Sequence, residues 1–158
     1  MLKRVPIGDV ESLDEVAQFL AHLQEPAVVV FDADNTLAPQ GITAEEFAPL
    51  VDNAIDRFEA LEVVDRVIVL TNGPPRGVER MESRGNKPWT SRGRLGLSSW
   101  NAPIVVVGDQ VLTDGVLAWR LGATFLHLVI DDEREDGRQR TMRRIGAALK
   151  RTVFKPIA

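Results

Sequence analysis

The sequence predicts an α/β fold in which a parallel β-sheet lies between two layers of helices, a Rossmann-like three-layer sandwich. Four short apolar runs, at residues 27–31, 67–70, 104–107 and 125–130, are rich in Val, Ile or Phe and nearly continuous. Continuous runs are typical of strands buried on both faces, as in a parallel sheet covered by helices. Helical patterns lie between the runs, and strands that alternate with helices form a doubly wound sheet. Functional sites of such sheets form at the carboxyl ends of the strands.

Two of the expected helices have clear signals. The first is expected to begin at Ser12, because Ser12 and Glu15 have the spacing of a capping box. The second has apolar residues at helical spacing, with Pro49 near its start, where a missing N–H costs little. Its apolar stripe consists of Phe47, Leu50, Val51, Ala54, Ile55 and Phe58. Further helices are expected at about residues 78–83, 112–121 and 138–152.

The composition excludes several classes of protein. The chain has 158 residues, 44% of them hydrophobic, which fits one domain over residues 1–158. It contains no cysteine, which excludes disulfides, thiolate metal sites and thiol redox chemistry. A net charge of −4 predicts no general affinity for nucleic acid. Because no apolar run approaches the ~20 residues of a membrane span and none follows the basic start, we expect neither a membrane span nor a signal peptide, and a cytoplasmic location.

Carboxylates follow two of the predicted strands. Asp32 and Asp34 come directly after the first apolar run, and Asp109 and Asp114 follow the third. A solvated turn or the start of a helix would also explain acidic residues at these places. The chain has no G-x-x-x-x-G-K-[ST] segment, which excludes a P-loop nucleotide-binding protein.

Two further polar segments lie between these carboxylates in the chain. The second apolar run ends in Thr71, Asn72 and Gly73, whose hydroxyl, amide and flexible backbone can hold a phosphate oxygen, although a turn before two prolines explains them equally well. Lys87 is expected to be extended because Pro88 follows it. It offers a positive charge, although a lone lysine is usually solvated.

In this order, the segments resemble the four motifs of the haloacid dehalogenase (HAD) superfamily of phosphotransferases, which are D-x-D-x-T, a strand-end Ser or Thr, a Lys, and G-D-x(3–4)-D. The matching residues are Asp32, Asp34, Thr36, Thr71, Lys87, Asp109 and Asp114. The segments 34–37, 71–73, 87–88 and 108–114 are further similar to the YqeG-type group of HAD subclass IIIA, which is similar to phosphatidylglycerophosphate phosphatases. The resemblance covers nearly the whole chain and implies a HAD-like fold, here without a cap domain because neither possible insertion is long enough to form one.

The resemblance also implies an enzyme, a Mg²⁺-dependent phosphomonoester hydrolase. Asp32 would attack phosphorus and form an aspartyl-phosphate, and Asp34 would act as general acid and then general base. Mg²⁺ would be bound by Asp32, the backbone carbonyl of Asp34, and Asp109, an oxygen-only set that suits a hard cation. Asp114 would orient a metal-bound water or Lys87.

The remaining roles follow from the same resemblance. Thr71, Asn72 and Lys87 would bind the phosphate, with Lys87 offsetting charge on the nucleophile and the phosphate. We expect His22 to be solvated and His127 to be structural rather than catalytic. Without a cap the site is open, which favours a large or membrane-borne substrate or a partner surface that closes over it.

The substrate and the role of the C-terminal helix stay open. Phosphatidylglycerophosphate is one candidate, and a soluble sugar phosphate or nucleotide is another. A non-catalytic phosphate- or protein-binding module on the same scaffold is a third interpretation, opposed by the complete set of catalytic positions. Residues 137–158 hold seven basic residues and no acidic one. The expected helix there, with Met142, Ile145, Leu149 and Val153 near one face, either packs on the sheet or contacts anionic lipid at the inner membrane face.

Overall fold

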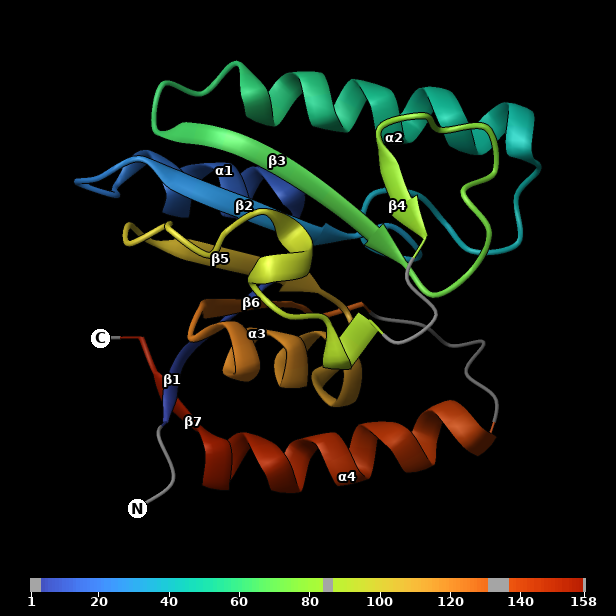
Figure 1. Ribbon diagram of the computed structural model, residues 1–158. Helices are drawn as coiled ribbons and strands as arrows, with labels where there is room; N and C mark the ends of the chain where they lie inside the picture. The colour runs from blue at the N-terminus through green and yellow to red at the C-terminus, as the bar shows by residue number, and fades with distance from the viewer. Residues whose placement is uncertain (1–3, 84–86, 131–136, 158) are drawn as a thin grey trace.

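A seven-stranded parallel sheet forms the centre of the molecule (Figure 1). The structure is a computed structural model that describes residues 4–83, 87–130 and 137–157. In chain order the strands are β1 (Val5–Val10), β2 (Ala27–Asp32), β3 (Val64–Thr71), β4 (Met81–Ser83), β5 (Ile104–Gly108), β6 (Thr124–Leu128) and β7 (Phe154–Pro156). They lie in the sheet in the order β4-β3-β2-β5-β6-β1-β7. The expected α/β fold with a parallel sheet is therefore confirmed.

Helices cover both faces of this sheet, which gives three layers. The four helices are α1 (Leu13–Ala21), α2 (Ala44–Glu59), α3 (Val116–Leu121) and α4 (Gly137–Val153). Figure 1 shows α1 and α2 on one face of the sheet and α3 and α4 on the other. Three short turns complete the described structure, namely the 3-10 turns η1 (Lys87–Trp89) and η2 (Gly93–Leu95) and the π-helical turn η3 (Val111–Gly115).

Strand β2 shows why its apolar run is continuous. All six of its residues are buried, and successive side chains of a strand point to opposite faces. Val29 and Phe31 belong to the core beneath α1 and α2, whereas Val28 and Val30 belong to the core beneath α3. The Phe31 ring lies 4.6 Å from the Phe58 ring of α2, measured between centroids. Each face of the sheet thus has its own apolar core, and β2 needs apolar side chains toward both.

The strand order determines where a site can form. From β2 the chain adds β3 and β4 on one side, whereas β5 and β6 lie on the other side. In open parallel sheets, ligands bind at the carboxyl ends of the strands where the order reverses, which here are β2 and β5. Asp32 ends β2, Thr71 ends β3, and Asp109 follows β5. In the described part of the chain, no inserted domain covers this edge of the sheet.

Two expectations about the edges of the sheet are wrong. The helix predicted at residues 78–83 is absent, because residues 81–83 form β4 and pair with β3. Val78 and Met81 are both buried, so their i, i+3 spacing imitates a helical stripe. Strands β1 and β7 were not expected at all, because neither has a continuous apolar run. β7 is the opposite edge strand and β1 lies next to it, where partly exposed side chains are tolerated.

The helix starts agree with expectation in part, since α1 begins after the N-cap Ser12 as predicted. Helix α2 begins at Ala44 because Thr43 and Glu46 form a reciprocal capping box, so Pro49 lies inside the helix. The Ser12 hydroxyl accepts from the Glu15 N–H as expected, but the Glu15 carboxylate accepts from the N–H of residue 11, which leaves that capping box incomplete. Leu50, assigned to the buried stripe of α2, is 44% exposed. The helix expected at residues 112–121 starts as the π-helical turn η3 and continues as α3.

Helix α4 is packed on the molecule along part of its length. Leu149 and Val153 pack against the core beneath α3, whereas Met142 and Ile145 are 38% and 50% exposed. The four apolar residues therefore do not form one buried face, because Met142 and Ile145 contact solvent. No helix in the described ranges combines the length and the hydropathy needed to cross a membrane.

Candidate active site

Three buried charged side chains meet at the carboxyl ends of β2 and β5. The Lys87 Nζ lies 2.5 Å from Asp32 Oδ1 and 2.7 Å from Asp114 Oδ1. All three side chains are at most 8% exposed. Burial of one charge alone costs several kcal/mol, but an ammonium between two carboxylates satisfies all three groups. The expectation of a solvated lysine is therefore excluded, and these three predicted site residues are brought together.

The backbone around Lys87 explains how its side chain reaches the site. The Lys87 N–H donates to Asn72 Oδ1 at 3.0 Å, which joins the loop after β3 to the start of η1. The Thr90 N–H donates to the Lys87 carbonyl at 3.1 Å and closes the turn. The extended conformation expected for Lys87 is thus wrong, because these bonds and the two ion pairs outweigh the preference imposed by Pro88.

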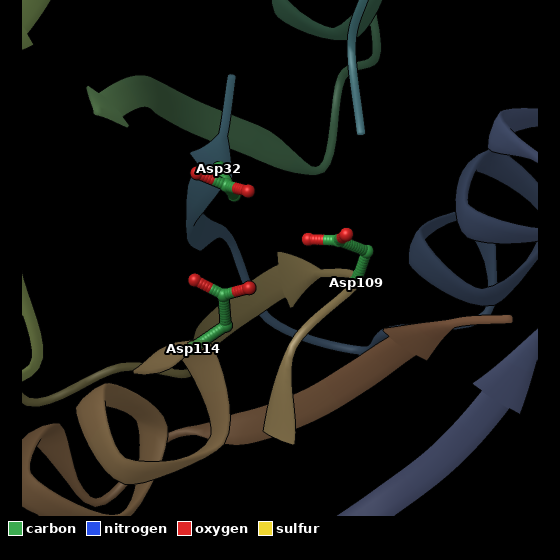
Figure 2. Close-up of side chains that lie close together, drawn as sticks. All are labelled: Asp32, Asp109 and Asp114. Atoms are coloured by element: carbon green, nitrogen blue, oxygen red, sulfur yellow. The ribbon is translucent and has the colours of Figure 1, made fainter. Parts of the chain in front are cut away.

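Asp109 adds a third carboxylate to the cluster. One oxygen from each of Asp32, Asp109 and Asp114 lies within 4.8 Å of the others, and Figure 2 shows the three carboxylates converging from β2, from the residue after β5 and from η3. The Asp109 Oδ1 is buried and has no hydrogen-bond partner. Such an atom normally has a partner, which a bound water or cation would supply.

The donor set fits a hard divalent cation. It consists of carboxylate oxygens, which Mg²⁺ prefers. Together with Lys87, the three carboxylates carry two excess negative charges when ionised, which one divalent cation neutralises. The side chain of Asp34, the fourth residue expected at the metal, contacts Thr71 and Arg76 instead. The atom of Asp34 that was expected to bind the cation is its backbone carbonyl oxygen, which takes no part in these side-chain contacts.

The close packing of Gly108 and Asp114 explains the glycine of the G-D pair. A Cβ on Gly108 would lie 2.1 Å from Asp114 Oδ2, so no other residue fits without displacing this carboxylate. The same oxygen accepts from the Gln110 N–H at 3.1 Å. Asp114 is thereby fixed at the position where it contacts Lys87.

The pKa values of the cluster reflect burial and mutual repulsion. Burial and the nearby Asp114 carboxylate raise the pKa of Asp32 well above its usual range, against the lowering effect of Lys87. Burial and Asp114 raise the pKa of Asp109 to about 6. Burial alone would lower the pKa of Lys87, but the charges of Asp114 and Asp32 outweigh it and raise the pKa. Without a cation, the site thus favours a bound proton on its carboxylates.

Beside this cluster, Asp34 forms a second set of contacts. The loop after β2 turns at Asn35, which has a φ of 59°, and Asp32 and Asp34 are two residues apart, the spacing at which an extended chain places side chains on one side. The Thr71 hydroxyl donates to Asp34 Oδ2 at 3.0 Å and accepts from the Gly73 N–H at 3.0 Å. These bonds join Asp34, the second aspartate of the D-x-D segment, to the end of β3.

Sequence reasoning missed Arg76. Its guanidinium forms an ion pair with Asp34 Oδ1, and it lies over the Phe47 ring of α2 with its Cζ 3.5 Å from the centroid. Arg76 has a φ of 46°, in the left-handed region. A single arginine in a loop after two prolines gives no sequence signal for this contact, which depends on the path of the loop.

Trp89 and the two histidines lie at different distances from the cluster. Trp89 of η1 is 63% exposed, and the Arg120 guanidinium lies 5.1 Å from its ring centroid. His22 is exposed, as expected, with Nδ1 2.7 Å from the Gln18 carbonyl oxygen. His127, expected to be structural, is partly buried, and its Nε2 lies 3.2 Å from the Asp109 carbonyl oxygen.

Comparison with known proteins gives no relative. No family model matches the chain, and neither the curated proteins nor the solved structures yield a match. The interpretation of the site therefore depends on its own geometry.

Replacement of Gly108 by Ala tests the packing around Asp114. The added methyl group must displace the Asp114 carboxylate and weaken its pair with Lys87, so we expect a loss of about 3 kcal/mol or more in the free energy of unfolding. Urea unfolding measures the loss. Gly73→Ala is the control, because its Cβ would meet only Thr71 Oγ1, at an ordinary 3.6 Å, and a change below about 1 kcal/mol is expected. Equal effects of the two substitutions would contradict the steric argument.

The raised pKa of Asp109 predicts an unusual pH dependence for the metal-free protein. The folded state holds this proton up to about pH 6, whereas an unfolded Asp releases it near 3.8. Ionisation therefore costs stability in the folded state, and the free energy of unfolding should fall as pH rises from about 4 to 7, by at most about 3 kcal/mol. Urea unfolding in chelator, compared with Asp109→Asn, measures this contribution. Parallel pH curves for the two proteins would show that Asp109 is not the source.

Proposed function

We propose that this protein is a Mg²⁺-dependent phosphomonoester hydrolase of the HAD type that acts through an aspartyl-phosphate. The observation that carries the proposal is the cluster at the end of β2 and β5, in which Asp32 pairs with the buried Lys87 and faces an unpartnered oxygen of Asp109. A nucleophilic carboxylate, a fixed positive charge and a cation site are the parts that phosphoryl transfer requires.

In this proposal Asp32 and Asp34 divide the chemistry. An Asp32 oxygen attacks phosphorus, the bond to the leaving oxygen breaks, and a proton from Asp34 converts the leaving alkoxide to an alcohol. Asp34 then accepts a proton from water as the water attacks phosphorus, which releases inorganic phosphate and regenerates the Asp32 carboxylate. Mg²⁺, bound by Asp32, Asp109 and the Asp34 carbonyl, would offset the negative charge of the phosphoryl group.

Neighbouring residues place these two carboxylates. Lys87 offsets the charge on Asp32 and on the phosphate, and Asp114 fixes Lys87 from the opposite side. The Thr71 hydroxyl donates its one hydrogen to Asp34 Oδ2, so in this proposal it would turn from Asp34 to donate to a phosphate oxygen. Asn72 supports the site through Lys87, because its Oδ1 already accepts from the Lys87 N–H.

Substitution of the proposed nucleophile tests the function directly. Asp32→Asn should lower turnover of p-nitrophenyl phosphate by about 10³-fold or more, because an amide cannot form the phosphoryl intermediate. Activity of the wild type should require Mg²⁺ and fall in Ca²⁺, whose longer bonds and higher coordination number would let it engage both Asp32 oxygens. Beryllium fluoride with Mg²⁺ should raise the melting temperature of the wild type as a phosphoryl mimic.

The matched control is Asp65→Asn, at an exposed position on β3, which should retain full activity. Circular dichroism checks that Asp32→Asn is folded. The proposed mechanism would be contradicted if Asp32→Asn turned over substrate as fast as the wild type. Full activity of the wild type in excess chelator would also contradict it.

The exposed residues of α4 favour a membrane-borne substrate for the proposed hydrolase. Met142 and Ile145 are exposed on a helix that also carries the exposed Arg144 and Arg151. Apolar side chains among basic ones are typical of a helix that lies on an anionic lipid surface. A phosphomonoester lipid such as phosphatidylglycerophosphate would reach an uncapped site from such a surface, whereas a soluble phosphomonoester needs no such contact.

Vesicle flotation distinguishes these substrates. The wild type should float with anionic vesicles at low salt, and the variant with Arg138, Arg140, Arg143 and Arg144 changed to Gln should not, because each basic residue adds about 1 kcal/mol of screened attraction. Both proteins should hydrolyse a soluble ester equally well. The control changes Arg57 of α2, and Arg80, which pairs with Asp56 and Glu59 of α2, to Gln and should float like the wild type. A wild type that fails to float with anionic vesicles would favour the soluble substrate.

A further inference from the structure

A chain of polar contacts joins α4 to the backbone of Asp109. His127 lies near the end of β6, beside Asp9 on β1 and Gly108 on β5. Its Nε2 is 3.2 Å from the Asp109 carbonyl oxygen, and its Nδ1 is 2.9 Å from the Lys150 Nζ. Lys150 also donates to Asp9 Oδ1 at 2.5 Å. The contacts bring together residues from β1, the end of β5, β6 and α4.

The chemistry of each atom fixes the direction of these hydrogen bonds. A carbonyl oxygen only accepts, so His127 Nε2 must carry the hydrogen and donate to Asp109. The Nδ1 lies 2.9 Å from the Lys150 Nζ, which only donates, and 3.0 Å from Asp9 Oδ1, which only accepts. In a neutral imidazole this Nδ1 is an acceptor, so the hydrogen bond it makes is the one from Lys150. Burial and the Lys150 charge lower the pKa of His127, which agrees with a neutral ring. Lys150 thus contacts both Asp9 and His127 and orients the His127 ring. The ring in turn donates a hydrogen bond to the Asp109 carbonyl oxygen, which restrains the Asp109 backbone.

We infer that His127 is a positioning residue, which Lys150 and Asp9 orient so that it fixes the backbone of Asp109 and thereby sets the cation affinity of the site. This inference rests on the proposed function, because it takes Asp109 as a cation ligand. Asp109 is the first residue after β5, and its Oδ1 has no hydrogen bond that would orient it. The backbone contact to His127 is therefore a restraint on where this carboxylate oxygen lies. Outer contacts of this kind change metal affinity by 10–100-fold in metal sites.

The test measures cation binding rather than activity alone. Isothermal titration calorimetry with Mg²⁺ gives the dissociation constant of the full-length protein, and urea unfolding in chelator gives its stability. We expect His127→Ala to weaken Mg²⁺ binding by about 10–100-fold, with turnover at saturating Mg²⁺ much less affected. His127→Gln should stay within about threefold of the wild type, because its amide can donate to the Asp109 carbonyl and its oxygen can accept from Lys150.

Lys150→Met provides a second, independent variant. Lys150 is 25% exposed at its side chain, so its removal perturbs the fold less than a change within β6, and an intermediate loss of Mg²⁺ affinity is expected. Arg80→Met is the matched control, because it removes a basic side chain that pairs with Asp56 and Glu59 on the other face of the sheet, and it should leave Mg²⁺ binding unchanged. Asp109→Ala is the positive control for loss of a ligand.

The outcomes distinguish a failure of this inference from a failure of the proposed function. Wild-type Mg²⁺ affinity in both His127→Ala and Lys150→Met would overturn the positioning role while leaving the cation site intact. Equal weakening in His127→Ala and His127→Gln would also overturn it, since the hydrogen bond would then not be responsible. A wild type that binds no Mg²⁺ would overturn the proposed cation site and this inference together.

Discussion

The ion pairs of the buried Lys87 ammonium are the interaction on which the site depends. An isolated ammonium at this depth would cost several kcal/mol, and the carboxylates of Asp32 and Asp114 offset that cost from two sides. The dependence is mutual, because each carboxylate would be an unpaired buried charge without Lys87. Several otherwise unrelated features serve this arrangement, including the turn at η1, the Asn72 contact and the absence of a side chain at Gly108.

The balance of charge then explains why the site is suited to a ligand. One ammonium cannot neutralise three carboxylates, and burial together with this excess charge raises the pKa values of Asp32 and Asp109. If the cluster contributed only to stability, apolar residues of similar volume would stabilise the fold as well or better. The excess negative charge thus favours the proposed binding of a cation. The cation would in turn offset the negative charge of the phosphoryl group.

Much of the fold and of this cluster could be predicted from the sequence, because parallel strands that are buried on both faces leave continuous apolar runs. Residues that follow such runs meet at one edge of the sheet, which is why Asp32, Thr71 and Asp109 were located in advance. The conformation of Lys87 could not be predicted, since bonds to Asn72 and to two distant carboxylates determine it. The contacts of Arg76 and the bridge from Lys150 to His127 join loop or surface residues across the fold, and nothing local in the sequence marks them.

The position of β1 in the sheet has a consequence for how the chain folds. Of the described strands, β1 is synthesised first, yet it lies between β6 and β7, with Val5 opposite Phe154 and Ile7 opposite Phe125. Its backbone therefore has no neighbours in the sheet until more than a hundred further residues have been added. Such pairings between distant segments form slowly, because a long loop must close first. The β2–β3 half can assemble during synthesis, whereas the edge that carries β1, and with it Asp9, is completed only when the last strand is present.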